Sequence, residues 1–256
     1  MKSFKTFARL HQNSIPLLLA NIWDVNSAQL FEQAGYKAIG TSSQAVAKSM
    51  GYDDGENLPF ETLLQFAKRV TKVVNIPFTV DIEAGYSRSV DGIIENIKKL
   101  HDAGVVGINL EDTIPGATRQ LLPVNEFQGI LSNIAESINR NNLQLFLNIR
   151  TDGFLLGMPT ALAETLERIK SYQDSGANGI FVPCITAKDD IKKVVSATHL
   201  PINVMCMPEL PGFEELKSLG VRRISMGPFV NNLINKKTVE AITTILKDNN
   251  FSSLFK

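Results

Sequence analysis

The sequence predicts a (β/α)₈ barrel, the TIM-barrel class of α/β fold, and three observations lead to it. The chain has 256 residues, 44% of them hydrophobic, and barrels of this class commonly run to about 250 residues as one domain. Short apolar runs rich in Val and Ile alternate with segments of helical period. No Pro/Gly/Ser-rich linker interrupts this alternation, so we expect a single domain over residues 1–256.

The N-terminal segment, residues 1–24, is expected to form an amphipathic helix followed by the first strand. Its apolar run ends at Asn21 and is too short for a membrane span, and no small-residue cleavage site follows it. We therefore expect a cytoplasmic protein.

Eight apolar runs are candidate strands. Strands buried on both faces and joined by helices form a parallel sheet, and eight such units favour a closed barrel. An open doubly wound sheet is the alternative, although no GxGxxG turn follows any run. The candidate strands cover residues 15–21, 37–43, 76–84, 105–112, 143–152, 178–184, 201–206 and 221–228.

Helical patterns fill the intervals, and four of them end in a glycine where a helix C-cap would place a left-handed residue. These four patterns cover residues 27–35, 90–104, 162–176 and 213–220. The segment 229–246 predicts a final helix, and the tail after it carries two further Phe residues. Such an apolar tail packs either on its own barrel or on a partner subunit.

The charges exclude some partners and favour others. Lys plus Arg number 26 and Asp plus Glu number 26, and they are scattered along the chain. Because no basic run is present, we expect neither a nucleic acid nor a membrane partner, but a small molecule. Cys184 and Cys206 lie in apolar runs far apart, which favours buried free thiols in a reducing compartment over a disulfide.

Acidic residues close two successive candidate strands. Asp81 and Glu83 are two positions apart and are expected to face the same side, at the barrel mouth. Asn109 and Glu111 share a face of the next run by the same period. In a parallel barrel the carboxyl ends of the strands form the active-site face, so we expect these side chains to meet there.

Three carboxylates in one space raise the pKa of at least one acid unless a cation neutralises them. All-oxygen ligation suits Mg²⁺, with Mn²⁺ as a second choice, and the lack of His and Cys at strand ends argues against Zn²⁺. We predict a metal site at Asp81, Glu83 and Glu111. The alternative is that these acids pair with basic neighbours at the rim.

Other polar residues follow the second and fifth runs. Arg150 is expected to be either an ion-pair partner of the acids or a clamp for a substrate carboxylate or phosphate. The segment 40–44 offers hydroxyls and N–H groups at a helix start, either as an oxyanion cradle or as a plain N-cap. No Lys closes a strand, which argues against Schiff-base chemistry.

The three histidines, His11, His101 and His199, fall in the leader, a helix and a turn, where we expect surface roles.

Together, the segments GTSSQAVAKSMGYDDGE, VDIEAGYS, GINLEDT and NIRTDGF resemble the isocitrate lyase and phosphoenolpyruvate mutase superfamily. The likeness covers nearly the whole chain, and with FVPC and GVRRISMGP it resembles the phosphonomutase-like branch. It implies a barrel whose last helix is exchanged between subunits, usually in a dimer of dimers. It also implies formation or cleavage of a C–C or P–C bond beside an α-keto acid, through a metal-stabilised enolate of pyruvate.

The resemblance also implies residue roles. Mg²⁺ would be bound chiefly by Asp81, with Glu83 and Glu111 acting directly or through water, and Glu83 departs from the Asp usual at its position. Further expected site residues are Ser42, Ser43 and Gln44 for the α-oxocarboxylate, Asp54 on a loop near the metal, and Asn109 and Arg150 for the substrate. Among them, Ser42, Asp54 and Arg150 are expected to be catalytic.

The loop after the fourth run, residues 113–122, does not match a known subgroup. It lacks the Lys-x-Cys-Gly-His motif of isocitrate and methylisocitrate lyases, so that activity is not expected. Because the loop is short, decarboxylation or retro-aldol cleavage of an oxaloacetate-like acid becomes plausible. Arg119 could supply positive charge to a substrate carboxylate or phosphonate, but we interpret it as a solvated loop residue.

Two functions are therefore open. The first is a Mg²⁺-dependent enzyme acting on a small α-oxocarboxylate, as an oxaloacetate-like lyase or decarboxylase or as a phosphonopyruvate-type mutase or hydrolase. The second is a silent barrel that binds metal and an oxyacid as a regulatory protein. Retention of Asp54, Asp81, Glu111 and Arg150 favours the first, because a charged cluster without function costs stability.

Overall fold

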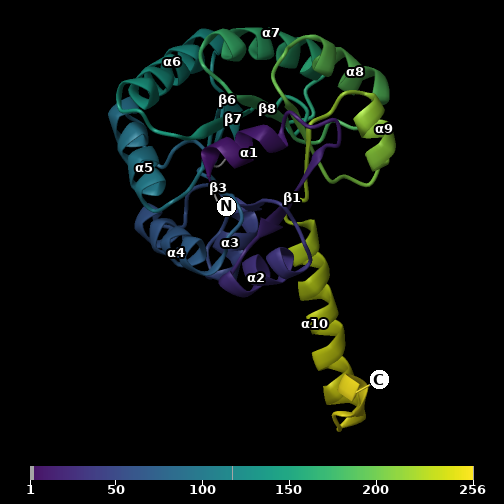
Figure 1. Cartoon of the computed structure of the whole chain (residues 1–256). Helices are drawn as coiled ribbons and strands as arrows, with labels where there is room; N and C mark the ends of the chain where they lie inside the picture. The colour runs from purple at the N-terminus through teal and green to yellow at the C-terminus, as the bar shows by residue number, and fades with distance from the viewer. Residues whose placement is uncertain (1–2, 117, 256) are drawn as a thin grey trace.

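The computed structural model describes residues 3–116 and 118–255. Eight parallel strands close into a barrel in the order β1-β10-β9-β8-β7-β4-β3-β2. A ring of helices surrounds them (Figure 1). The predicted barrel is therefore confirmed, and its closure removes the open sheet as an alternative.

Each of the eight candidate strands is a barrel strand. The strands are shorter than the apolar runs, because the ends of each run lie in the loops that join strand to helix. Their bounds are β1 Leu17–Ile22, β2 Ile39–Thr41, β3 Phe78–Asp81, β4 Gly107–Glu111, β7 Phe146–Arg150, β8 Gly179–Val182, β9 Ile202–Met205 and β10 Arg223–Ser225.

The predicted helices are also present. All four glycines that close the helical patterns have positive φ, from 89° at Gly104 to 99° at Gly176, as a left-handed C-cap requires. The helices are α1 Phe4–Leu10, α2 Val25–Gln33, α3 Ser43–Ser49, α4 Phe60–Val73, α5 Val90–Asp102, α6 Val124–Arg140, α7 Ala161–Asp174, α8 Lys188–Ser196, α9 Phe213–Ser218 and α10 Phe229–Asp248.

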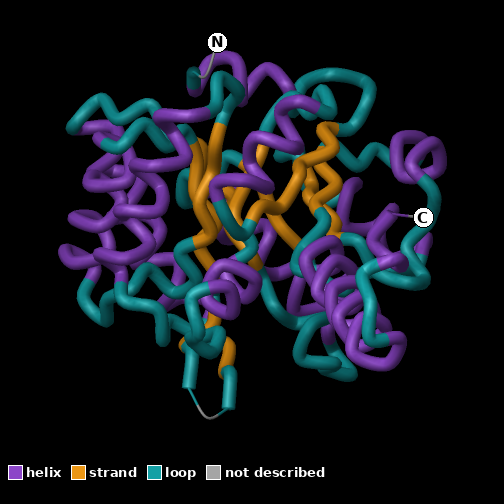
Figure 2. The backbone as a smooth tube through the Cα atoms, turned by 90° about the horizontal axis from the view of Figure 1, so that it is seen from below, coloured by secondary structure: helices purple, strands orange, loops and turns teal. Residues whose placement is uncertain are grey.

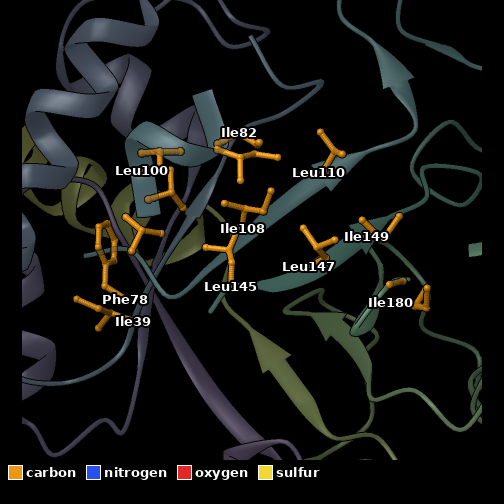
Figure 3. Close-up of a cluster of buried hydrophobic side chains, with 14 of the residues drawn as sticks. Ile39, Phe78, Ile82, Leu100, Ile108, Leu110, Leu145, Leu147, Ile149 and Ile180 are labelled. Atoms are coloured by element: carbon orange, nitrogen blue, oxygen red, sulfur yellow. The ribbon is translucent and has the colours of Figure 1, made fainter. Parts of the chain in front are cut away.

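The main hydrophobic core lies between the barrel and the helix ring. Ile108 and Leu110 of β4 and Leu147 and Ile149 of β7 alternate with the inward-facing residues and supply part of it (Figure 3). All four are at most 2% exposed. Burial of such side chains contributes roughly 25 cal/mol per Å² of apolar surface, and this layer fixes the strands from outside.

Helix α1 covers the N-terminal end of the barrel (Figure 1). Phe7 of α1 packs edge-on against Phe146 of β7, with ring centroids 5.4 Å apart. His11 stacks on the same Phe146 ring at 4.4 Å and is only 5% exposed. The expected surface role of His11 is therefore wrong, because a short helix folded across the barrel floor buries its own C-terminus.

The barrel interior above this floor is polar. Asn148 Nδ2 donates to Asn109 Oδ1 at 2.9 Å and to Asn203 Oδ1 at 3.2 Å. Arg223 is 1% exposed, and its Nη2 donates to Asn109 Oδ1 at 3.3 Å. Burial lowers the pKa of Arg223, and Asp81 opposes that shift. The interior thus connects the floor of the barrel to its mouth by hydrogen bonds.

A small two-stranded sheet follows β4 and was not predicted. It consists of β5 Thr113–Ile114 and β6 Gln120–Leu121, paired antiparallel. This hairpin extends from the end of the barrel opposite to the N-terminus (Figure 2). It therefore stands beside the carboxyl ends of the barrel strands.

Helix α10 projects away from the barrel (Figure 1). Asn231 is its one buried residue, while Leu233, Val239, Ile242 and Leu246 are between 51% and 82% exposed. Beyond α10 lies the short 3₁₀ helix Ser252–Phe255. The barrel of the same chain therefore leaves the apolar surface of α10 uncovered.

The two cysteines are free thiols, as expected. They are not buried, however, because Cys184 is half-buried and Cys206 is exposed, both just beyond the ends of β8 and β9. Within the described part of the chain, no helix is both long and apolar enough to cross a membrane.

Candidate active site

A cavity of about 420 Å³ opens at the carboxyl ends of the barrel strands. Its polar wall includes the last residues of β2, β3 and β7, which are Thr41, Asp81 and Arg150. Strand register brings these ends together, because Asp81 pairs with Asn109 and Glu111 pairs with Arg150 across neighbouring strands. The predicted position of the site therefore follows from the barrel itself.

Asp81 is held by two hydrogen bonds at the mouth of the barrel. Its Oδ1 accepts from the Glu83 backbone N–H at 3.0 Å, and its Oδ2 accepts from Asn109 Nδ2 at 3.2 Å. The Asn109 amide cannot turn freely, because its Oδ1 accepts from Asn148 and Arg223. Asp81 is 7% exposed and lines the cavity with a defined orientation.

Glu83 lies elsewhere than the period of a strand predicts. Strand β3 ends at Asp81, and Glu83 has a φ of +50°, so the expected shared face with Asp81 does not exist. Its two carboxylate oxygens each accept from the Glu56 backbone N–H at 3.1 Å, and Oε1 also accepts from the Tyr86 hydroxyl. Glu83 is buried behind the cavity lining.

The expected crowding of acids is nevertheless present around Glu83. Burial and the negative charges of three neighbouring carboxylates raise the pKa of Glu83 to about 8. The three neighbours are Asp54, Asp81 and Glu111. Two of these neighbours, Asp54 and Asp81, also line the cavity.

Glu111 is the centre of a buried ion-pair cluster. Its Oε1 lies 2.8 Å from Arg119 Nη1, and its Oε2 lies 3.0 Å from Arg150 Nη1. Arg150 also donates to both oxygens of Asp152, at 2.6 Å and 3.0 Å. Burial opposes the charge of Arg150, but Glu111 and Asp152 outweigh it and raise its pKa. The ion-pair role expected for Arg150 is thus present.

Arg119 is not a solvated loop residue, and this interpretation of the sequence is wrong. Its side chain is 20% exposed and reaches into the cavity from the residue just before β6. Nη1 donates to Glu111 Oε1 and to Asp152 Oδ2, and Nη2 lies 3.8 Å from Asp54 Oδ2. The hairpin fold places this guanidinium beside that of Arg150, which periodicity along the chain could not indicate.

Asp54 lines the cavity from the loop after α3, as the resemblance implied. Burial and the charge of Asp81 raise its pKa, while Arg119 and Arg150 act in the opposite direction. The loop is fixed through Glu56, which accepts from the Tyr86 backbone N–H at 2.7 Å and pairs with Arg88 at 2.6 Å. The loop that carries Asp54 is therefore tied to the segment after β3.

Ser42, Ser43 and Gln44 line the cavity at the start of α3. Ser42 is the N-cap, and its Oγ accepts from the Ala45 N–H at 3.4 Å. The cap role is therefore present, and Ser43 and Gln44 bring the first turn of the helix to the cavity wall. The first N–H groups of a helix have no partner within it, which suits them to an anionic group.

Sequence reasoning missed a second buried ion pair below the cluster. Asp112, fully buried, lies 3.1 Å from Arg168 Nη1 and accepts from the Tyr172 hydroxyl at 2.8 Å. Its Oδ1 accepts from the Asp152 backbone N–H at 3.3 Å. Arg168 and Tyr172 are four residues apart on the inner face of α7, and that spacing was the one available signal.

The residues that line the cavity fit Mg²⁺, a cation that needs few protein ligands. Within residues 3–116 and 118–255, no three His, Cys, Asp or Glu side chains are grouped to hold a metal by themselves. Mg²⁺ does not need such a cage, because it usually keeps several waters and takes one or two carboxylates plus substrate oxygens. Asp81 and Asp54 face the cavity, and the negative charge that raises the pKa of Glu83 favours a cation there.

The arrangement can bind anions and a cation side by side. Two guanidinium groups, those of Arg119 and Arg150, line the same cavity as Asp81 and Asp54. Arginine binds carboxylate and phosphonate oxygens through paired N–H donors. A ligand with an acidic head group therefore finds N–H donors and carboxylates that can hold a cation in the same cavity.

Comparison with known proteins gives consistent matches. The model of the phosphoenolpyruvate phosphomutase family matches residues 7–246. The structure of a Burkholderia cenocepacia J2315 protein, provisionally named a phosphonomutase, is 35% identical with a TM-score of 0.88, covering 94% of this chain and 99% of that one.

Two enzymes are more distant relatives. The 2-methylisocitrate lyase of Escherichia coli (strain K12) is 28% identical over 85% of this chain and 75% of its own. The oxaloacetate decarboxylase of Bradyrhizobium sp. (strain BTAi1) is 26% identical over 80% of this chain and 70% of its own.

Proposed function

Since the chain belongs to the phosphoenolpyruvate phosphomutase family, whose relatives include lyases and mutases, we propose that it is a Mg²⁺-dependent enzyme acting on a small α-oxocarboxylate. It makes or breaks a C–C or P–C bond next to the oxo group, with a pyruvate enolate as intermediate. The observation that carries this proposal is the single cavity into which Asp81, Arg119 and Arg150 all project.

The residues divide the work as follows. Ser42, Ser43 and Gln44 bind the α-oxocarboxylate through the first turn of α3. Arg150 contacts the substrate at the group that is cleaved or transferred, because it lies at the end of β7 facing the cavity. Asn109 orients Asp81 through its Nδ2 and also lines the cavity, where it contacts the substrate.

Asp81 would hold Mg²⁺ directly, with Asp54 at the cavity wall and Glu83 and Glu111 acting through water. When bound, Mg²⁺ supplies a Lewis acid that stabilises negative charge developing on the enolate oxygen. The protein's part is to fix the carboxylates before the metal arrives, which the two hydrogen bonds to Asp81 do.

Arg119 gives the reaction its second positive group. The Lys-x-Cys-Gly-His motif is absent, and the loop instead brings a guanidinium within 2.9 Å of two buried carboxylates, Glu111 and Asp152. Arginine cannot serve as the acid that a cysteine provides, but it stabilises a leaving carboxylate or phosphonate. This favours an oxaloacetate-like lyase or decarboxylase, or a phosphonopyruvate-type enzyme, over a methylisocitrate lyase.

We also propose that α10 is exchanged with a second copy of the chain, in a dimer or a dimer of dimers. Support comes from its projection away from the barrel and from apolar side chains such as Ile242 and Leu246, which are 51% and 82% exposed. A surface of this kind on one helix is typical of a subunit interface.

The proposed reaction is tested with four substrates. Oxaloacetate, phosphonopyruvate, phosphoenolpyruvate and 2-methylisocitrate are each incubated with the full chain and Mg²⁺, and pyruvate or a rearranged product is followed. We expect turnover of oxaloacetate or phosphonopyruvate and none of 2-methylisocitrate. Failure with every substrate, together with metal and oxalate binding, would favour the silent barrel instead.

A further inference from the structure

The cavity has two chemically different sides that follow the order of the barrel strands. Strands β2, β3, β4 and β7 are contiguous and supply the acids, amide and arginine of the site. Strands β8, β9 and β10, the segments after them and Leu155 in the loop after β7 supply a mostly apolar side, which we name the apolar arc. It consists of Leu155, Phe181, Cys184, Met205, Met207 and Phe229.

Two contacts hold parts of the apolar arc together. Cys184 Sγ lies 3.9 Å from Met207 Sδ, which joins the loop after β8 to the loop after β9. Gly227 has a φ of +56°, and a Cβ there would lie 2.7 Å from Met205 Sδ. The absence of a side chain at Gly227 therefore lets Met205 lie against the segment that leads into Phe229.

The polar residues on this side of the cavity are used within the protein. Asn21 Oδ1 accepts from the backbone N–H groups of Met226 and Gly227, at 2.7 Å and 3.0 Å. Ser225 Oγ accepts from Asn203 Nδ2 at 3.1 Å and donates to the Val204 carbonyl. What this side offers to a ligand is therefore hydrocarbon and sulfur surface.

The cavity is large enough for a ligand to contact the apolar arc as well as the polar side. A volume of about 420 Å³ equals that of roughly 14 waters at about 30 Å³ each, so a pyruvate-sized head group on the polar side fills only part of it. Leu155 and Phe229 are 38% and 36% exposed at the cavity wall. Water left against such side chains is unfavourable, and an apolar group that displaces it gains affinity.

We infer that the substrate carries an aliphatic or aromatic side chain that lies on the apolar arc while its oxyacid head group lies on the polar side. The preferred substrate class is thus an α-oxocarboxylate extended by an apolar substituent, which binds more tightly than the bare three- or four-carbon acid. This inference rests on the proposed function, because the polar side must bind the head group for the side chain to reach the arc.

Straight-chain 2-oxo acids test the inference directly. Pyruvate, 2-oxobutanoate, 2-oxopentanoate and 2-oxohexanoate are titrated into the full chain with Mg²⁺, and Kd is measured by calorimetry. We expect Kd to fall by about fourfold for each added methylene, as for burial of a CH₂ group. A Kd that stays flat or rises along the series, while pyruvate and oxalate bind, would overturn the inference and leave the proposed function standing.

Two further outcomes complete the test. If neither oxalate nor any 2-oxo acid binds, the proposed function fails and this inference fails with it. In Met205→Gln and Met207→Gln, we expect the gain per methylene to fall below about twofold, because the arc becomes polar. Met50→Gln, at the end of α3 and outside the cavity lining, is the matched control and should keep the fourfold gain.

If the gain in affinity per methylene is unchanged in both Met205→Gln and Met207→Gln, the proposal that the substrate side chain lies on the apolar arc is overturned.

Discussion

Arg119 Nη1 lies 2.9 Å from Asp152 Oδ2 although 33 residues separate them along the chain. This contact joins the β5–β6 hairpin to the loop after β7 and brings a second guanidinium to the site. Together with the buried Thr113 hydroxyl, which lies within hydrogen-bond distance of Glu111 and Asp152, this ion pair fixes the hairpin to the barrel through polar contacts.

Arg119→Met keeps the length of the side chain and removes its charge. Glu111 and Asp152 then keep Arg150 as their positive partner, beside the Thr113 hydroxyl. We expect the free energy of unfolding to fall by roughly 2 kcal/mol, with kcat/KM lowered about 100-fold. Urea denaturation and steady-state kinetics measure the two effects. Arg69→Met, on the exposed surface of α4, is the control. Unaltered kinetics would remove Arg119 from the reaction.

Asp81→Asn tests the metal site while preserving the shape of the side chain. We expect Mg²⁺ affinity to fall by more than about 100-fold, because the amide carries no negative charge, with the barrel still folded. Calorimetric titration of Mg²⁺, with Mn²⁺ as a second probe, measures this. Asp91→Asn in the first turn of α5 should bind metal as the parent chain does. Equal affinity in both variants would exclude Asp81 as the principal ligand.

His11 gives the fold a pH dependence away from the active site. Its Nδ1–H donates to the Phe7 carbonyl, and burial, with the charge of Arg223, lowers its pKa to about 3. The unfolded chain takes up a proton below about pH 6.5, and the folded chain does not until about pH 3, so stability is lost as pH falls through that window.

Between pH 7 and pH 5 the loss attributable to His11 is roughly 2 kcal/mol. His11→Phe should flatten this dependence while keeping the ring stack on Phe146. Urea denaturation at both pH values measures it, and His199→Phe, on the exposed turn before β9, is the control. A pH dependence that survives in His11→Phe would place its origin elsewhere.

The proposed exchange of α10 between subunits is tested by placing a charge on the apolar surface of this helix. Ile242→Glu and Leu246→Glu should convert the proposed dimer or tetramer to a monomer, because a carboxylate cannot be buried there without a partner. Light scattering after size-exclusion chromatography reports the mass. Lys236→Glu places the same charge on the polar side of α10 and should leave the assembly intact. A parent chain that runs as a monomer would refute the exchange outright.

Much of the barrel could be predicted from the sequence, because each strand is a short apolar run and glycines such as Gly104 and Gly176 mark where helices end. The positions of Asp81 and Arg150 followed, since parallel strands bring their carboxyl ends together. The β5–β6 hairpin could not be predicted, because strands of two residues have no measurable period.

The site residues that were missed depend on contacts between distant segments. The pairing of Asp112 with Arg168 and the reach of Arg119 are set by how loops fold over the barrel, which no local pattern encodes. Glu83 was misplaced because a strand period was extended past the residue where β3 ends.

The interior asparagines give the barrel a direction. An amide has a donor end and an acceptor end, and Arg223 and Asn148 both donate to Asn109 Oδ1, which leaves Asn109 Nδ2 to donate to Asp81. If the Asn109 amide were flipped, its Nδ2 would face the N–H donors of Asn148 and Arg223, and these neighbours would have to rearrange. The orientation of a carboxylate at the mouth is thus set by a buried guanidinium that reaches it through a single asparagine.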